Sequence, residues 1–238
     1  MAKRTHNLQQ AVKGKIKSFL NTSNRIFFNE RDLQMHLALW LKQHSKWDVE
    51  VEYFVPSSAL LNQNNYPWKK ANGKDLQDMY VDIVVCDETE YVPIELKYKT
   101  RKANGFNSLR FGKNAITTNL KNQSAQDLGR YDFWKDVHRL EVLKTVFKPA
   151  TLNGIAIFLT NDQAYLNAAK QGTNCQNFYM SDGKGTSSFM KNTNCKWENG
   201  AASKYPSRPD FCLNNPMSLL WFKYQCQGVD FHYAIVEV

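Results

Sequence analysis

The sequence has no long hydrophobic run. A membrane-spanning helix needs about 20 consecutive apolar residues, and a secretory signal needs an apolar segment behind its basic start. Residues 1–7 are basic, but no such segment follows them. We therefore expect a cytoplasmic protein with no membrane partner.

Cysteine and histidine are also scarce. The five cysteines form an odd set without any Cys-x-x-Cys pair, which favours reduced thiols over a disulfide framework. Their wide spacing favours ordinary thiols over a zinc site in the C-terminal third, although the zinc alternative stays open. The histidines show no spacing typical of a catalytic triad or a ligand set. No fixed repeat is apparent, which argues against a solenoid.

Positive charge, by contrast, is plentiful. Lys and Arg number 31 against 22 Asp and Glu, which gives a formal net charge of +9. This surplus favours a polyanionic partner such as nucleic acid over a small neutral substrate. A length of 238 residues and an apolar fraction of 42% suffice for one large domain with a core of its own.

Hydrophobic periodicity predicts a mixed α/β fold. We expect a helix over 29–42, a strand over 46–55, a long loop over 57–76, a helix over 117–147 with a break near Gly129, and a buried strand over 154–160. Two further strands precede the second helix, and a mixed sheet with helices on both faces is the natural packing. Residues 1–161 would form this core. Residues 162–238 would form an irregular extension, with a final helix near 218–224 and an edge strand at 231–238, packed on the core as one domain.

The two further strands, 80–85 and 91–99, carry charged residues inside hydrophobic runs. A carboxylate in an apolar interior is strongly disfavoured unless it is paired, hydrogen-bonded or bound to a metal. Alternation places Glu95, Lys97 and Lys99 on one face of the second strand. An even-length turn centred on residues 88 and 89 then sets Asp82 directly opposite Glu95. The sequence therefore predicts a site where the two carboxylates meet.

Facing carboxylates repel, and a divalent cation between them relieves this repulsion. Both are hard oxygen donors without Cys or His nearby, so we expect Mg²⁺ or Mn²⁺. Such an ion acidifies a bound water and neutralises charge on a phosphate. The Lys97 ammonium would position the attacking water or stabilise the developing negative charge.

This arrangement resembles the PD-(D/E)XK nuclease superfamily over about residues 26 to 160. Asp82 stands at the first acidic position, Glu95-Leu96-Lys97 matches the E-x-K triplet, and Val81 replaces the motif's proline. The resemblance implies a restriction-endonuclease-like αβββαβ core of class α/β, with a mixed central sheet flanked by helices and here an irregular C-terminal extension. It also implies a glutamate on the first helix as a further metal ligand, which Glu30 matches.

A second acidic-x-Lys triplet, Asp182-Gly183-Lys184, lies in a Gly/Ser-rich segment and lacks this strand context. The alternative to the nuclease-like fold is a structural salt bridge on another α/β sheet.

Further residues would complete the site. The segment after the second charged strand mixes basic residues, aromatics and glycines, which favours DNA contact over a solvated mobile loop. Its expected nucleic-acid-binding residues are Lys99, Arg101, Lys102, Arg110 and Lys113. Some members of the family that this chain resembles also carry a glutamine or lysine on the second helix. We therefore expect supporting or substrate-contacting residues among Gln123, Gln126, Asp127 and Tyr131, although a plain polar helix face explains them equally well.

Three functions compete at this point. The first is a Mg²⁺-dependent phosphodiesterase that cuts DNA, with catalytic residues Asp82, Glu95, Lys97 and Glu30 and metal ligands Asp82, Glu95 and Glu30. The second is a non-catalytic nucleic-acid-binding protein on the same fold. The third is an interaction protein whose buried charges form an internal ion pair. We favour the first, with double-stranded DNA as partner, and the sequence leaves open a homodimer, the DNA recognised, and a role in restriction or repair.

Overall fold

The computed structural model of the chain describes residues 8–61, 66–70, 73–88, 90–110, 114–151, 153–181, 194–217 and 219–238, with the side chains of 108–110 and 114–115 left out. The elements are α1 (Leu8–Thr22), α2 (Glu30–Gln43), β1 (Asp48–Val55), the 3-10 helix η1 (Ser57–Leu60), β2 (Met79–Asp87), β3 (Glu90–Lys99), β4 (Ala103–Arg110), β5 (Asn114–Leu120), α3 (Gln126–Val146), β6 (Ile155–Thr160), the 3-10 helix η2 (Gln163–Leu166), β7 (Asn194–Cys195), α4 (Ala201–Lys204), β8 (Phe211–Cys212), β9 (Trp221–Cys226) and β10 (Val229–Glu237).

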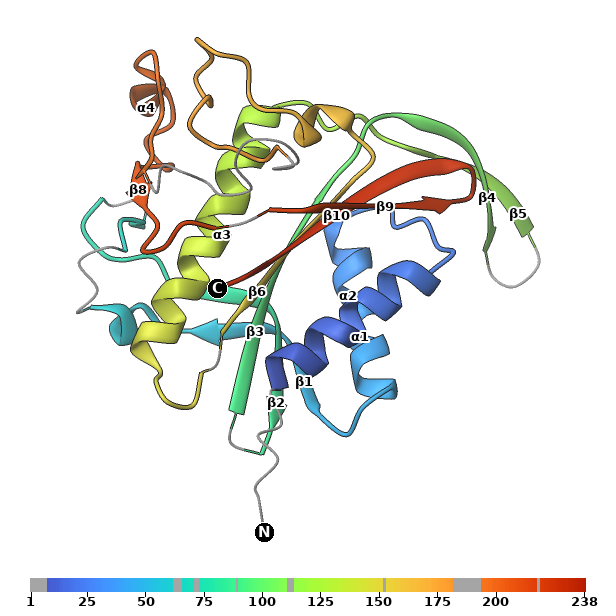
Figure 1. Cartoon of the computed structure of the whole chain (residues 1–238), viewed down its shortest axis with the longest axis horizontal. Coiled ribbons are helices and arrows are strands. Elements are labelled where there is room, and N and C mark those ends of the chain that lie inside the picture. Colours follow the sequence, from blue (N-terminus) through green and yellow to red (C-terminus); the bar gives the residue numbers. More distant parts are fainter. Residues whose placement is uncertain are drawn as a thin grey trace.

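A mixed six-stranded sheet with the order β1-β2-β3-β6-β10-β9 forms the centre of the fold. Only β3 and β6 run parallel, and every other neighbouring pair is antiparallel. Helices α1 and α2 cover one face of the sheet, and α3 covers the other (Figure 1). The predicted mixed sheet with helices on both faces is therefore confirmed.

Each face of the sheet has its own apolar core. Ile94, Leu96 and Tyr98 of β3 pack with α1 and α2 on one side. On the other side, α3 packs against Ala156 and Phe158 of β6. Since all six residues of β6 are buried, this strand lies between the two cores, as its continuous apolar sequence predicts.

Local sequence signals account for the elements that position the charged residues. The side chain of Asn29 accepts a hydrogen bond from the Asp32 amide and caps α2, which begins at Glu30 as expected. Strands β2 and β3 pair in the predicted register, with Ile83 opposite Ile94 and Val85 opposite Val92. One helix was not foreseen. Leu8, Val12 and Ile16 recur at helical spacing in α1 and are fully buried.

The segment between β3 and α3 corrects two predictions. The expected helix over 117–147 begins only at Gln126, because residues 114–120 form β5 of a hairpin with β4. The expected loop after residue 99 is largely the first strand of this hairpin, which projects from the body of the molecule (Figure 1). Gly129 does not break α3. A Cβ atom there would lie 2.3 Å from the Tyr165 hydroxyl, so glycine permits the close approach of η2.

The C-terminal extension contributes more to the sheet than predicted. A helix was expected near 218–224, but residues 221–226 form the edge strand β9, and β10 lies inside the sheet between β6 and β9, not at its edge. Another described part of the extension packs on α3, where the buried Glu141 carboxylate accepts hydrogen bonds from the backbone amides of Asn214 and Asn215. The five cysteines are all free thiols, in agreement with the sequence.

The segment expected as a loop over 57–76 also packs onto α3 where it is described. Leu60, Tyr66 and Trp68 are buried there, and Trp68 is only 1% exposed. Its indole Nε1 donates a 3.0 Å hydrogen bond to the Tyr131 hydroxyl. Aromatic side chains within the polar sequence thus anchor this segment.

Candidate active site

Asp82 and Glu95 meet where β2 and β3 separate. The ladder between these strands ends at the pair Ile83 and Ile94, and the two acids are the next residues on each strand. At this point the Leu96 amide donates a 2.6 Å hydrogen bond to Asp82 Oδ2, so the carboxylate occupies the place of a continuing ladder bond. The observed ladder thus has the predicted register up to the pair Ile83 and Ile94, and beyond it Asp82 contacts β3 through the Leu96 amide.

The backbone around Asp82 is irregular. Val81 packs into the core beside α3, whereas Ile83, two residues on, packs into the opposite core, so the alternation of faces breaks at Asp82. On the neighbouring strand, Glu52 has a φ of +52°, which is unusual for a residue other than glycine. Gln34 of α2 connects the two strands, since its Nε2 donates to the Asp82 carbonyl at 2.7 Å and to Glu52 Oε1 at 3.2 Å. Irregular strand geometry of this kind re-aims side chains and is common next to active sites.

Glu30 reaches the same place from the start of α2. Its Oε2 accepts a 2.7 Å hydrogen bond from the Tyr98 amide, and its Oε1 lies 3.4 Å from Lys97 Nζ. The Asn29 cap fixes the first turn of the helix against β3, which explains how a residue distant in sequence joins the cluster. The structure thus brings together all four predicted catalytic residues: Glu30, Asp82, Glu95 and Lys97.

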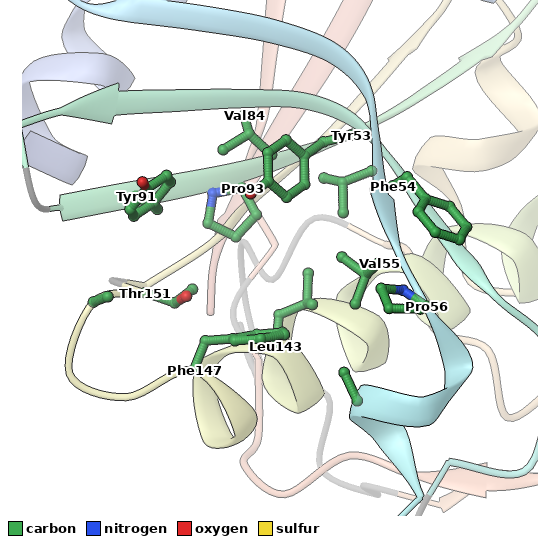
Figure 2. Close-up of a pocket in the computed structure, with 13 residues that line it drawn as sticks. Tyr53, Phe54, Val55, Pro56, Val84, Tyr91, Pro93, Leu143, Phe147 and Thr151 are labelled. Atoms are coloured by element: carbon green, nitrogen blue, oxygen red, sulfur yellow. The ribbon is translucent and has the colours of Figure 1, made fainter.

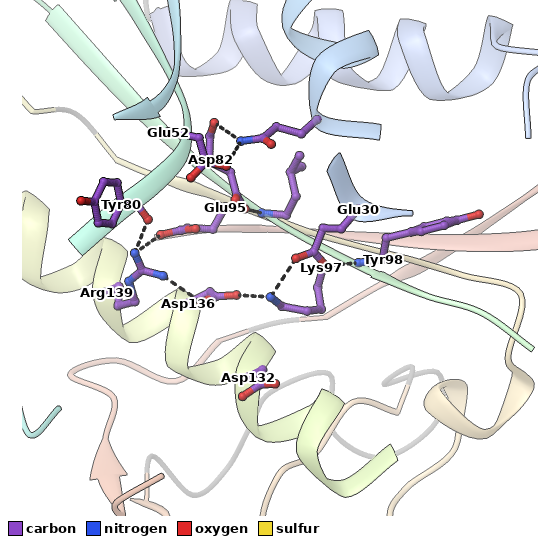
Figure 3. Close-up of polar contacts among 12 residues, drawn as sticks. Glu30, Glu52, Tyr80, Asp82, Glu95, Lys97, Tyr98, Asp132, Asp136 and Arg139 are labelled. Carbon is purple, nitrogen blue, oxygen red and sulfur yellow. Dashed lines mark hydrogen bonds and ion pairs between the residues drawn. The ribbon is translucent and has the colours of Figure 1, made fainter. Parts of the chain in front are cut away.

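Two residues of α3 complete the cluster and were missed from the sequence (Figure 3). Asp136 Oδ2 lies 3.0 Å from Lys97 Nζ, and Asp136 Oδ1 lies 3.3 Å from an Arg139 guanidinium nitrogen. Arg139 Nη2 also lies 3.3 Å from Glu95 Oε1, but it donates its hydrogen bond to the Tyr80 carbonyl. Glu95 Oε1 is therefore paired in charge while having no hydrogen-bond partner.

The cluster carries more negative than positive charge. The four carboxylates of Glu30, Asp82, Glu95 and Asp136 face two cations, Lys97 and Arg139. Burial, followed by repulsion from Asp136, raises the pKa of Asp82 to about 6, although the Leu96 amide and Lys97 oppose this shift. Burial also raises the pKa of Glu95 well above its ordinary value, with Asp136 and Asp82 adding to the rise.

For the two cations, burial and the neighbouring carboxylates shift the pKa in opposite directions. Burial lowers the pKa of Lys97, but Asp136, Glu30 and Asp82 together outweigh it, and the net pKa lies above the ordinary value. Burial likewise lowers the pKa of Arg139, and the carboxylates of Glu95 and Asp136 reverse the effect. Lys97 therefore remains an ammonium and can stabilise negative charge, but it cannot accept a proton.

Two residues of the cluster, Asp82 and Glu95, have the donor chemistry that a hard divalent cation needs. Glu95 Oε1 is buried without a hydrogen bond from any described residue, and the raised pKa values of Asp82 and Glu95 show that added positive charge there would favour their ionised forms. Glu30 fits less well as a third ligand, because Lys97 and the Tyr98 amide already engage its two oxygens. Within the described ranges, no group of three or more His, Cys, Asp or Glu is arranged to hold a metal ion.

The residues expected to support the site from α3 lie elsewhere. Tyr131 is fully buried, and its hydroxyl donates to the Pro209 carbonyl at 2.7 Å. Gln126 donates to Asp162 Oδ2 at 2.6 Å, while Asp127 Oδ2 accepts from the Tyr205 hydroxyl at 3.4 Å. Gln123 precedes the helix, and its backbone N–H donates to the carbonyl of Thr100 beyond the end of β3. The polar face at the start of α3 therefore holds η2 and the extension.

The predicted nucleic-acid-binding residues are only partly described. Arg101 Nε lies 3.0 Å from Asp162 Oδ1, which fixes it beside η2. Lys102 is exposed and Lys99 is half-buried. The side chain of Arg110 and the whole of Lys113 lie outside the described residues.

An apolar pocket of about 340 Å³ adjoins the cluster at the next turns of α3. Tyr53, Val84, Pro93, Leu143 and Phe147 are among the side chains that line it (Figure 2). It contains no charged side chain, so the charged chemistry is confined to the cluster beside it.

Comparisons with known proteins give no relative. No protein-family model, curated protein or solved structure matches this chain. Among the described residues, each helix is too short or too polar to cross a bilayer.

Proposed function

We propose that the chain is a metal-dependent phosphodiesterase that cuts DNA and has the PD-(D/E)XK nuclease fold. The observation that carries the proposal is the meeting of Asp82 and Glu95 at the parting of β2 and β3, with the Lys97 ammonium in the same cluster. The order α2, β1, β2, β3, α3, β6 also supports it, since it follows the αβββαβ order with the 3-10 helix η1 and the hairpin β4–β5 inserted.

Asp82 and Glu95 would hold the cation through their oxygens. A divalent ion held there would acidify a bound water and neutralise charge on the scissile phosphate. Arg139 competes for Glu95 Oε1, because its guanidinium already lies 3.3 Å from that atom. The four carboxylates of the cluster outnumber its two paired cations, which favours the addition of a positive ion.

Lys97 acts through charge alone. Its raised pKa keeps it protonated at neutral pH, so it stabilises the negative charge that develops on the phosphate oxygens. Glu30 and Asp136 hold its Nζ from two sides at 3.4 and 3.0 Å and so limit its movement. A preorganised donor of this kind contributes about 100-fold to 1,000-fold to the rate.

Nicking of supercoiled plasmid in the presence of Mg²⁺ tests the proposal. Asp82→Asn and Lys97→Met should each lose about 100-fold or more of the wild-type rate, with DNA binding measured beside cleavage. Asp48→Asn on β1 provides the matched control, since Asp48 is an exposed acid of the same sheet whose partner is Lys42. Cleavage at the same rate by all four proteins would refute the proposal and indicate a contaminating nuclease.

A second function is favoured by one observation. Arg139 and Lys97 already neutralise part of the cluster without any metal, as they would in a binding protein that keeps the fold but not the activity. Such a protein would retain DNA in a salt-dependent manner and leave the plasmid intact with both Mg²⁺ and Mn²⁺.

A further inference from the structure

A groove with basic walls lies beside α3, on the turns next to the acidic cluster. It has a volume of about 900 Å³, which is near the upper end for sites that hold drug-sized ligands. Its lining includes Pro67, Lys69, Lys70, Asp132, Lys135 and Arg208. We call this the basic groove. Its walls come from the segment before β2 and from the segment before β8, which lie on the same side of α3 (Figure 1).

Buried aromatic contacts hold the two walls in place. Trp68 donates to the Tyr131 hydroxyl at 3.0 Å, and that hydroxyl donates to the carbonyl of Pro209 at 2.7 Å. The rings of Trp68 and Phe211 lie 5.4 Å apart. The basic groove is therefore built into the fold and does not depend on flexible surface lysines alone.

The positive charge of the basic groove is only partly neutralised. Arg208 pairs with Asp132 at 3.1 Å, and Lys70 pairs with Asp78 at 3.0 Å. Lys69 and Lys135 make no ion pair within the described part of the chain. Lys135 Nζ lies 5.5 Å from the centre of the Trp68 ring, and burial lowers its pKa. The nearby carboxylates of Asp136 and Asp132 oppose this lowering of the pKa without reversing it, so the partly buried ammonium gains from an added anion.

The position of the basic groove connects it to the acidic cluster. Asp132, which lines the groove, precedes Asp136 by one turn of α3, or about 6 Å along the helix axis (Figure 3). Lys135 is the immediate neighbour of Asp136, which pairs with Lys97. A polynucleotide backbone spans such a distance in one or two nucleotides, whereas a single small anion does not reach from the basic groove to the acidic cluster.

We propose that the basic groove binds the sugar–phosphate backbone of the polynucleotide strand whose scissile phosphate lies at Asp82 and Glu95, with Lys69 and Lys135 each contacting a phosphate. The proposal rests on the proposed function, and it places backbone contacts on α3 and the segment before β2 in addition to the hairpin β4–β5. Backbone contacts of this kind position the strand without reading its sequence.

Binding without cleavage tests the groove separately from the activity. The probes are a fluorescein-labelled single-stranded 20-mer and its duplex, measured by anisotropy in EDTA over a range of salt concentrations. Each lost phosphate contact should weaken binding about fivefold to eightfold at 0.1 M salt and reduce the salt slope by about 0.7 to 0.9. Lys69→Glu alters an exposed side chain, and Lys135→Gln keeps most of the stem that packs on Trp68.

Lys46→Glu is the matched control, because Lys46 is exposed and precedes β1 on the side of α2. Weaker binding and a lower slope for Lys69→Glu and Lys135→Gln, with Lys46→Glu unchanged, support the groove. Equal binding by all four proteins, or wild-type binding that does not depend on salt, overturns it. Plasmid cleavage is recorded independently: cleavage with unaffected groove variants refutes only the groove, and groove-dependent binding without cleavage refutes only the phosphodiesterase.

Discussion

Replacing Asp82 by Asn should stabilise the protein when no metal is present. The Asp82 carboxyl has a folded-state pKa of about 6 against an ordinary value of 3.8, so its ionisation costs the folded state about 3 kcal/mol once both states are ionised. Asparagine removes this charge. Its amide oxygen can still accept the hydrogen bond that the Leu96 amide donates at 2.6 Å.

The gain should depend on pH in a defined direction. Because the folded state holds the Asp82 proton more tightly, the cost is absent below pH 3.8, grows as the pH rises toward about 6, and is complete above that value. The Asp82→Asn protein should therefore be more stable than wild type by about 3 kcal/mol at pH 8 and about 1.6 kcal/mol at pH 5.

Urea unfolding in EDTA at the two pH values measures both differences. The control Asp48→Asn alters an exposed carboxylate and should stay within about 0.5 kcal/mol of wild type at either pH. A variant Asp82→Asn that is less stable than wild type at pH 8, or a gain that does not change between pH 5 and pH 8, would refute the account of the cluster as an excess of buried negative charge.

Two other substitutions test neighbouring contacts. Arg139→Gln leaves Glu95 without its counter-charge and should destabilise the protein by about 3 kcal/mol in EDTA. About 10 mM Mg²⁺ should recover part of this loss by binding the folded state, and urea midpoints that do not respond to Mg²⁺ would contradict a cation site at Glu95. Gly129→Ala should destabilise by about 1 to 2 kcal/mol, because the new Cβ would lie 2.3 Å from the buried Tyr165 hydroxyl. Adding Tyr165→Phe to the Gly129→Ala protein should recover part of the lost stability. An unfolding midpoint for Gly129→Ala above that of wild type would contradict the clash and show that η2 moves aside at no cost in free energy.

The predictable part of the fold is the part with strong local signals. The cap at Asn29, the alternation of β1 and the continuous apolar run of β6 each specify an element without reference to the rest of the chain. The register of β2 and β3 was also predictable. Only a turn with an even number of residues keeps Ile94 and Leu96 in the core and brings Asp82 toward Glu95.

The predictions for two other elements were wrong because their apolar patterns fit both a helix and a strand. Ile116 and Leu120 of β5 stand four apart, as in a helix, but they belong to a strand of the hairpin. The apolar residues between 219 and 224 are too closely spaced to distinguish a helical turn from a strand, and the chain forms β9 from Trp221 to Cys226. The helical spacing of Leu8, Val12 and Ile16, by contrast, is a sequence signal that does indicate α1.

The missing site residues have a different physical explanation. α3 is buried on most of its circumference, so it has no polar stripe by which its orientation can be predicted from the sequence. Asp136 and Arg139 are three apart on this helix, like many surface ion pairs. Only the packing of α3 across β3 turns this pair toward Glu95 and Lys97.

The charge balance distinguishes a structural ion pair from a site. A structural network gains most when its buried charges cancel, because each uncompensated ion carries the full cost of desolvation. Here four carboxylates share the two paired cations Lys97 and Arg139, and burial together with repulsion between the carboxylates raises the pKa values of Asp82 and Glu95. A divalent cation or a proton can supply the missing charge, and the two compete for the same oxygens. The cluster therefore favours a cation-binding function over a purely structural role, since the folded protein without a ligand bears a cost that binding removes.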